Sequence, residues 1–143
     1  MRKKFVIIFI TLFIVGIMGF LFLQSIDIKE EIMNSSQSYI IKCTYTASDT
    51  DCYRVDFTTE DEIQELAKTF DNQRLFPIPF VKNGHSYPLT TYHLVTNGNT
   101  EKWIELYSDS TLLVNGNGYF SFDFNDFYNK IEQGYMTKEP VEI

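Results

Sequence analysis

Cysteine and histidine are scarce in this sequence, with two of each among 143 residues. No pair of them has the spacing of zinc ligands, and the strings G-x-S-x-G, S-x-x-K and H-E-x-x-H are absent. The run Gly116-Asn117-Gly118 is short and lies between two predicted strands rather than before a helix, which does not suit a phosphate-binding loop. We therefore expect no catalytic residues, no metal site and no cofactor.

Positive charge is also in short supply. The chain has 12 Lys and Arg residues against 19 Asp and Glu, and beyond residue 24 the balance is 9 against 19, a net charge of −10. An acidic surface of this kind repels the phosphate groups of nucleic acids. We therefore expect no nucleic-acid partner.

Charge is missing altogether from residues 5–23, an apolar run broken only by one threonine and two glycines. A helix of this length is about 28 Å long, close to the roughly 30 Å of a bilayer's hydrocarbon core. Three basic residues, Arg2, Lys3 and Lys4, precede the run. Such a flank keeps the N-terminus in the cytoplasm and places the rest of the chain outside.

We interpret residues 1–24 as a transmembrane signal-anchor, which makes the protein a single-pass protein of the cell membrane. The first alternative is secretion after signal cleavage, although the apolar region of a signal peptide usually has only about 7–15 residues. The second alternative is a buried core helix, which a small domain could hardly enclose.

The rest of the chain divides into three predicted parts. Residues 25–38 are expected to form a juxtamembrane stalk, residues 39–134 an extracytoplasmic α+β domain, and residues 135–143 a polar tail. Beyond residue 24 the chain contains eight Phe, nine Tyr and one Trp, which is ample material for a folded core.

Alternating and helical patterns predict the elements of this domain. Period-2 alternation over 39–46 and 53–57 predicts a hairpin, and Thr59-Glu60-Asp61-Glu62 is a capping box that begins a helix near 60–71. Strands are predicted at 89–96, 100–108, 111–114 and 119–122, with Asn-Gly turns between the paired runs. A last helix begins after Asp123 and ends at Gly134.

These elements follow the order ββα-loop-ββββα. Runs of strands, rather than strict alternation of strand and helix, favour an antiparallel sheet. We therefore predict an α+β fold, with a mainly antiparallel sheet of about six strands and two helices packed on one face.

The two cysteines, Cys43 and Cys52, could form a disulfide on an exported chain. If the apolar side chains of both predicted strands share one face, however, Cys43 points inward and Cys52 outward. Direct pairing of the two cysteines would place Ile41 opposite Arg54, unless a bulge intervenes. A disulfide and two free thiols both remain open.

The segment between residues 72 and 88 is rich in proline yet too apolar for an idle linker. Its prolines confine any strand to an edge, and the edge near residues 77–82 could accept a strand from a partner. An apolar loop of this kind is either packed or a contact surface for a protein or peptide. The candidate partner-binding residues in it are Phe76, Ile78, Phe80, His85 and Tyr87.

Several hydrophobic and turn positions occur in a recognisable order: Thr59-x-x-Glu62-Ile63-x-x-Leu66, Tyr92-x-Leu94, Ile104-x-Leu106-Tyr107, Gly118-Tyr119-Phe120 and Phe127-x-x-x-Ile131. The arrangement resembles small extracytoplasmic domains of Gram-positive bacteria that hang from an N-terminal anchor, such as the YhfM-like domain. The resemblance covers about 75 residues. It implies a fold and a location but no activity, and the usual lipid-attachment cysteine near the N-terminus is absent here.

We therefore predict a membrane-tethered, non-catalytic binding module outside the cell membrane. It would contact a protein or peptide, either as an immunity or inhibitor protein or as a subunit of an envelope complex. One alternative is a small envelope enzyme, a hydrolase or thiol oxidoreductase, that uses His85 or the cysteines. The other is a structural or pilin-like envelope component.

Overall fold

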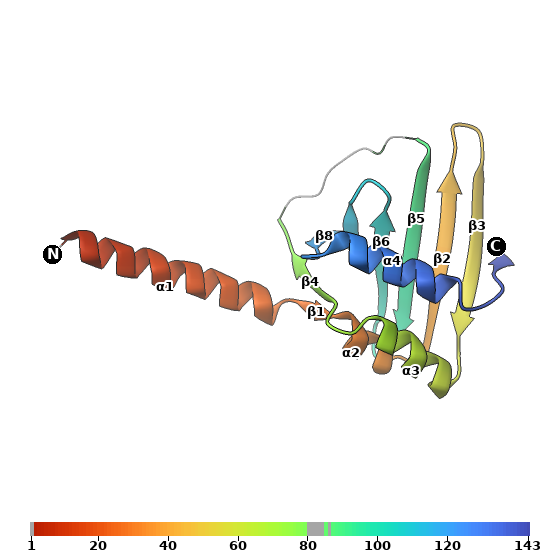
Figure 1. Ribbon diagram of the computed structural model, residues 1–143, viewed down its shortest axis with the longest axis horizontal. Coiled ribbons are helices and arrows are strands. Elements are labelled where there is room, and N and C mark those ends of the chain that lie inside the picture. The colour runs from red at the N-terminus through yellow and green to blue at the C-terminus, as the bar shows by residue number, and fades with distance from the viewer. Residues whose placement is uncertain (1, 80–84, 86) are drawn as a thin grey trace.

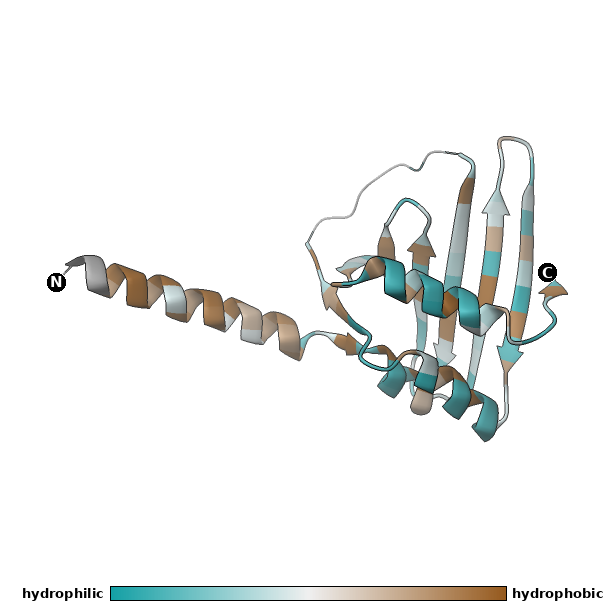
Figure 2. Ribbon diagram, viewed as in Figure 1, coloured by the Kyte–Doolittle hydropathy of each residue, from teal (hydrophilic) through white to brown (hydrophobic). Residues whose placement is uncertain are grey.

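A long helix, α1 (Arg2–Leu23), stands clear of a mixed α/β body in the computed structural model, which describes residues 2–79, 85 and 87–143 (Figure 1). Within Phe5–Leu23 no part of the helix is buried against the body. Figure 2 shows α1 mostly apolar along its length, whereas the outward surfaces of the later helices are largely polar. By length and composition, α1 is a helix that can span a membrane or act as a signal sequence.

The body is built on an antiparallel sheet that has nine strands in the described part of the chain. The spatial order is β1-β4-β8-β7-β6-β5-β2-β3-β9, and every pairing is antiparallel. The strands are β1 (Ile26–Asp27), β2 (Gln37–Tyr45), β3 (Thr50–Phe57), β4 (Arg74–Pro77), β5 (Leu89–Asn97), β6 (Glu101–Tyr107), β7 (Leu112–Val114), β8 (Asn117–Phe120) and β9 (Val141–Glu142).

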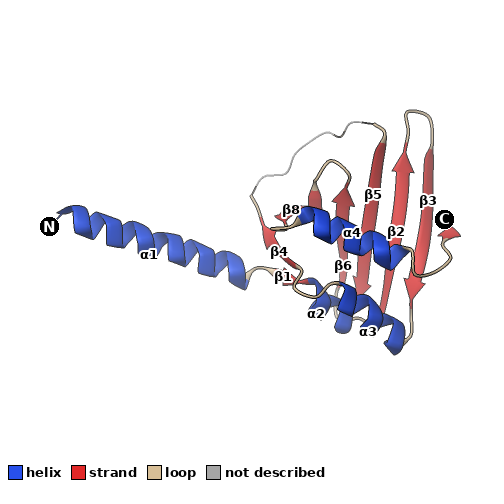
Figure 3. Cartoon of the chain, in the orientation of Figure 1, coloured by secondary structure: helices blue, strands red, loops and turns tan. Residues whose placement is uncertain are grey.

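Three further helices lie on one side of this sheet, α2 (Ile28–Met33), α3 (Glu60–Thr69) and α4 (Phe124–Tyr135) (Figure 3). The predicted α+β class and antiparallel sheet are therefore confirmed. The prediction of about six strands and two helices missed short elements, because β1, α2, β4 and β9 lie in segments expected to be stalk, loop and tail.

The core lies between the helices and the sheet face that they cover. Strand residues of one parity supply that face, and in the central strands they are Ile40, Tyr92, Leu94, Ile104, Leu106, Leu112 and Val114. Phe70 after α3 and Phe127 of α4 meet edge to face with ring centroids 5.7 Å apart, a favourable aromatic geometry. The hydroxyl of Tyr92 donates to Glu132 of α4 (2.9 Å), which satisfies its polar end inside the core.

The predicted stalk at residues 25–38 is wrong, because this segment is part of the domain. β1 pairs with β4, and Asp27 caps α2 by accepting a hydrogen bond from the Glu30 amide. Ile28 and Ile32 then point into the core and are completely buried. A two-residue strand and a six-residue helix leave almost no periodic signal in the sequence, which is why the segment looked like a linker.

The predicted polar tail at residues 135–143 also belongs to the body. Helix α4 continues through Gly134 to Tyr135, and β9 then pairs with β3. Gly134 does not end the helix. A Cβ atom there would lie 2.9 Å from Leu66 Cδ1 and 3.1 Å from Ile40 Cδ1, so glycine permits close packing of α4 on its neighbours.

The hairpin of β2 and β3 corrects the assumption about which side chains face inward. In β2 the helix-covered face carries Ser38 and Ile40, whereas Ile41 and Cys43 lie on the opposite face. The register is continuous without a bulge, so Cys43 stands opposite Cys52 and Ile41 opposite Arg54. The two cysteine sulfur atoms are 2.03 Å apart and form a disulfide.

The capping box at the start of α3 is present as predicted. The Glu62 amide donates to Thr59 Oγ1, and the Glu62 carboxylate accepts from the amides of Thr58 and Thr59. The ammonium of Lys138, from the segment expected to be tail, lies 2.5 Å from the same carboxylate. The hydrogen bond from Lys138, with those of the two amides, lowers the pKa of Glu62 from about 4.5 to about 2.

We expect Ile32→Ala to lower the free energy of unfolding by about 2–4 kcal/mol, because it opens a cavity beneath α2. Met33→Ala is the matched control, since the neighbouring Met33 is 47% exposed. Thermal unfolding of the full chain in detergent, followed by near-ultraviolet circular dichroism, measures both. Equal stability of the two variants would mean that α2 is not part of the folded core.

We also expect Glu62→Gln to weaken the dependence of stability on acid pH. A carboxyl whose pKa is lower in the folded state stabilises the fold above its unfolded pKa, and this stabilisation is lost as the pH falls toward about 2. Unfolding curves of wild type and Glu62→Gln should therefore differ at about pH 5 and converge near pH 2. Glu65→Gln, an exposed position on the same helix, is the control and should leave the wild-type profile in place.

Candidate functional site

The sheet face that no described helix covers is the main candidate site, and we call it the open face. Register places its central residues in rows that run across β3, β2, β5 and β6. One row is Asp56, Tyr39, Val95 and Trp103; the next is Arg54, Ile41, His93 and Glu105; the third is Cys52, Cys43, Thr91 and Tyr107. Aromatic rings, charges and the disulfide therefore lie side by side on one surface.

Trp103 lies near the centre of the aromatic contacts on the open face. Its ring meets Tyr39 edge to face with centroids 6.3 Å apart, and it meets His93 at the same separation. The indole N–H donates to the Glu101 carboxylate, and the side chain is 36% exposed. A large aromatic side chain that is held in place yet reaches solvent is typical of protein-contact surfaces.

Charged groups border these rings. The Arg54 guanidinium stacks on Tyr39, 3.9 Å from the ring centroid, and pairs with the Asp56 carboxylate at 2.5 Å. Glu101 and Glu105 add negative charge on β6. The open face therefore favours ligands that carry apolar and basic side chains over anionic ones.

His93 is the most enclosed titratable group on the open face. Its Nε2 lies 3.0 Å from Thr91 Oγ1, and its buried Nδ1 makes no hydrogen bond to any described residue. Burial lowers the pKa of His93 below its usual 6.5, and the opposing Glu105 charge raises it in part. The imidazole is therefore neutral at pH 7.

Tyr107 joins the proline-rich segment to the open face. Its hydroxyl donates to Glu105 (2.9 Å), and the His85 ring stacks flat on it with centroids 4.4 Å apart. His85 Nδ1 also lies 2.9 Å from Asp109 Oδ2. Burial raises the pKa of Tyr107, and its hydrogen bond to Glu105 adds to the rise.

The structure separates the residues that the sequence grouped as one partner-binding loop. Phe76 packs on Phe120 in β8, whereas His85 packs on Tyr107 in β6, and β7 lies between those two strands. Ile78 and Tyr87 are exposed, at 37% and 64%. Phe80 lies outside the described residues.

The predicted free strand edge near residues 77–82 is partly occupied. β1 pairs with residues 74–75, Pro77 pairs with Tyr119 of β8, and the Ile78 amide donates to the Gly118 carbonyl. Residues 80–82 lie outside the described part of the chain. We therefore place the candidate binding surface on the open face rather than at this edge.

Another candidate site is a hollow of about 400 Å³ between α3 and the chain after α4. Glu62, Lys138 and Gly134 line it, but Glu62 and Lys138 are engaged in the cap and ion pair described above. Among the residues that the structure describes, no group of three His, Cys, Asp or Glu side chains is arranged to hold a metal ion. The open face is the better-supported candidate.

Trp103 and Tyr107 are among the aromatic residues that the sequence offers as core material, yet both lie on the open face. A signal was present in β6, where these two aromatics share the parity of Glu101 and Glu105 while Ile104 occupies the other. The alternation therefore indicated which side faces solvent. β5 carries no such signal, because apolar and polar residues occur on both of its faces.

We expect the His93 imidazole of the full chain to titrate below pH 6.5 in a histidine-resolved NMR experiment. Because the unfolded state binds this proton more readily, burial of neutral His93 weakens the fold as the pH falls below 6.5. Glu105→Gln should lower the His93 pKa further, since it removes the charge that favours the imidazolium. A His93 pKa above 6.5 in wild type would contradict the enclosed geometry.

Comparisons with protein-family models, with curated proteins and with solved structures find no match to this chain. The resemblance to the YhfM-like domain therefore stays a prediction.

Proposed function

We propose that the protein is a membrane-tethered binding domain, located outside the cell membrane, that contacts a protein or peptide through its open face. The observation that carries the proposal is the row of anchored, partly exposed aromatic side chains on a sheet face that no described helix covers. In this proposal the domain is non-catalytic. It acts as an immunity or inhibitor protein or as an envelope-complex subunit, in keeping with the predicted likeness to small extracytoplasmic domains.

Two features support the location. Helix α1 is apolar over Phe5–Leu23 and is preceded by Arg2, Lys3 and Lys4, a pattern typical of a membrane span with a cytoplasmic N-terminus. The Cys43–Cys52 disulfide supports an oxidising compartment, because such bonds persist mainly outside the cytosol.

The chemistry of the open face supports a protein or peptide ligand. Tyr and Trp are the residues most enriched at the energetic centres of protein interfaces, and Arg54 against Tyr39 adds a third residue type of that kind. The acidic charge of the domain selects against anionic ligands and favours a partner with basic side chains.

The test places a photoreactive benzoylphenylalanine at position 103 of the full chain in intact cells. We expect crosslinks to one protein from position 103 and none from the matched position 129 on the outer surface of α4. Trp103→Ala should weaken capture of that protein by about 30-fold, the effect of truncating a central interface aromatic. Unchanged capture by a folded Trp103→Ala variant would contradict the open face as the binding site.

Protease shaving of the same cells tests the orientation separately. A tag after Ile143 should be lost on shaving if the domain is outside the membrane. A protected tag would contradict the proposed location, whatever the crosslinking result.

A further inference from the structure

Three phenylalanine side chains form a cluster at the end of the open face nearest α1. Phe76 stacks on Phe120 with ring centroids 5.4 Å apart, and Phe122 meets both rings edge to face at 5.1 and 5.2 Å. Phe122 is 81% exposed, and the adjoining Ile78 is 37% exposed. We call Phe76, Phe120 and Phe122 the phenylalanine cluster.

The connection between α1 and the sheet is short and held by several contacts. Only Gln24 and Ser25 separate α1 from β1, and the amide and hydroxyl of Ser25 both donate to the Phe22 carbonyl. β1 then pairs with β4, the strand that contains Phe76. The sheet edge is therefore joined to the end of the helix without a flexible linker.

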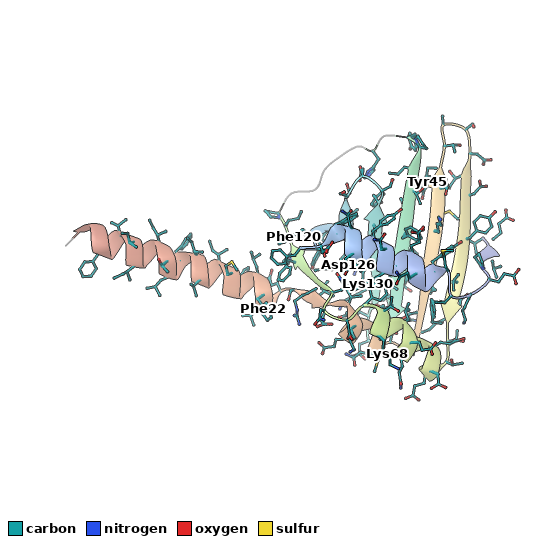
Figure 4. The ribbon with its side chains drawn as sticks, viewed as in Figure 1. Phe22, Tyr45, Lys68, Phe120, Asp126 and Lys130 are labelled. Carbon is teal, nitrogen blue, oxygen red and sulfur yellow. A yellow bond between two sulfur atoms is a disulfide. The ribbon has the colours of Figure 1, made fainter. Side chains whose placement is uncertain are left out.

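Arg74 is the centre of this junction. Its guanidinium donates to Ser25 Oγ and to Asp27 Oδ2, both at 2.9 Å, and lies over the Phe22 ring, 4.8 Å from its centroid. These contacts bring β4 to the level of the last turn of α1. Figure 4 shows Phe120 on the side of the body that faces α1.

The depth of this junction follows from the length of α1. Nineteen apolar residues at about 1.5 Å each span about 28 Å, so Leu23 reaches the boundary of a hydrocarbon core about 30 Å thick. Two extended residues add at most about 7 Å, and the polar headgroup layer is itself about 5–8 Å deep. β1 therefore begins, and the antiparallel β4 ends, within or directly above the headgroup layer.

We propose that the phenylalanine cluster is inserted into the headgroup region of the bilayer that α1 spans, as a second membrane contact of the domain. Phenylalanine rings of interfacial membrane contacts are buried at the boundary between headgroups and acyl chains, because their transfer out of water is favourable. The proposal rests on the membrane span in the proposed function. The contact is apolar rather than electrostatic, because the domain is acidic and Arg74, the cation next to the cluster, is already paired with Asp27.

This contact would determine the orientation of the open face relative to the membrane. The sheet order runs from β1 and β4 at the α1 side to β9 at the far edge, eight interstrand steps away. At about 4.8 Å per step, the path along the sheet from β1 to β9 is about 38 Å, which is the upper limit of their separation. With the near edge held at two points, the open face stands on the membrane and is accessible from the side rather than from above.

The test uses the full chain in phosphatidylcholine vesicles that contain lipids brominated in the upper acyl chain, which quench tryptophan on contact. Trp103→Phe removes the native indole, and Phe122→Trp in that background reports on the cluster. Val141→Trp in the same background is the matched control, because Val141 is 66% exposed but lies in β9. We expect the brominated lipids to quench the tryptophan emission of the Phe122→Trp chain, to the same extent at low and high salt. The emission of the Val141→Trp chain should be unchanged.

The outcomes separate this inference from the proposed function. If the Phe122→Trp chain floats with the vesicles but its tryptophan emission is not quenched, the membrane span is retained and the proposed membrane contact of the phenylalanine cluster is contradicted. Quenching by aqueous acrylamide measures how far the tryptophan at position 122 is accessible to water. If its protection depends on protein concentration rather than on lipid, the cluster contacts a second copy of the chain instead of the membrane. A chain that does not float with the vesicles contradicts the membrane span and, with it, the contact.

Discussion

Burial of a single face of the sheet beneath α2, α3 and α4 is the constraint on which the rest of the structure depends. Once Ile40, Leu94 and Ile104 face the helices, alternation along each strand directs their neighbours to the other side. Trp103 and His93 are therefore on the open face because of what the residues next to them bury. The same pairing of the strands therefore determines both which residues form the core and which residues form the open face.

The two ends of the chain complete the two edges of the sheet. β1 follows α1 and covers part of β4, while β9 follows α4 and covers part of β3. Arg74 secures the first junction, and Lys138 secures the second through Glu62. Because an unpaired strand edge exposes hydrogen-bonding groups, these short pairings protect the sheet, and the pairing of β1 also joins α1 to it.

Regular, strongly patterned elements were predictable from the sequence. The helix at 60–69 follows from its capping box and apolar stripe, and Asp123 begins the last helix as expected, with its carboxylate accepting from the Asp126 amide. The central strands also lie close to their predicted ranges. Short elements such as β1, α2 and β9 were missed, since two to six residues cannot display a period and their stability comes from long-range pairing.

The sequence by itself determined the apolar N-terminal helix, the α+β class and the acidic character of the domain, because length, local period and charge are properties of the chain alone. Only the tertiary structure decided which parity of β2 and β5 is buried, and with it that Cys43 meets Cys52 and that His93 contacts Trp103. It also brought Phe76 beside Phe120 and β4 beside the end of α1. The physical reason is that apolar and polar residues occur on both faces of these strands, so alternation alone does not identify the buried face, and the choice depends on where the helices pack.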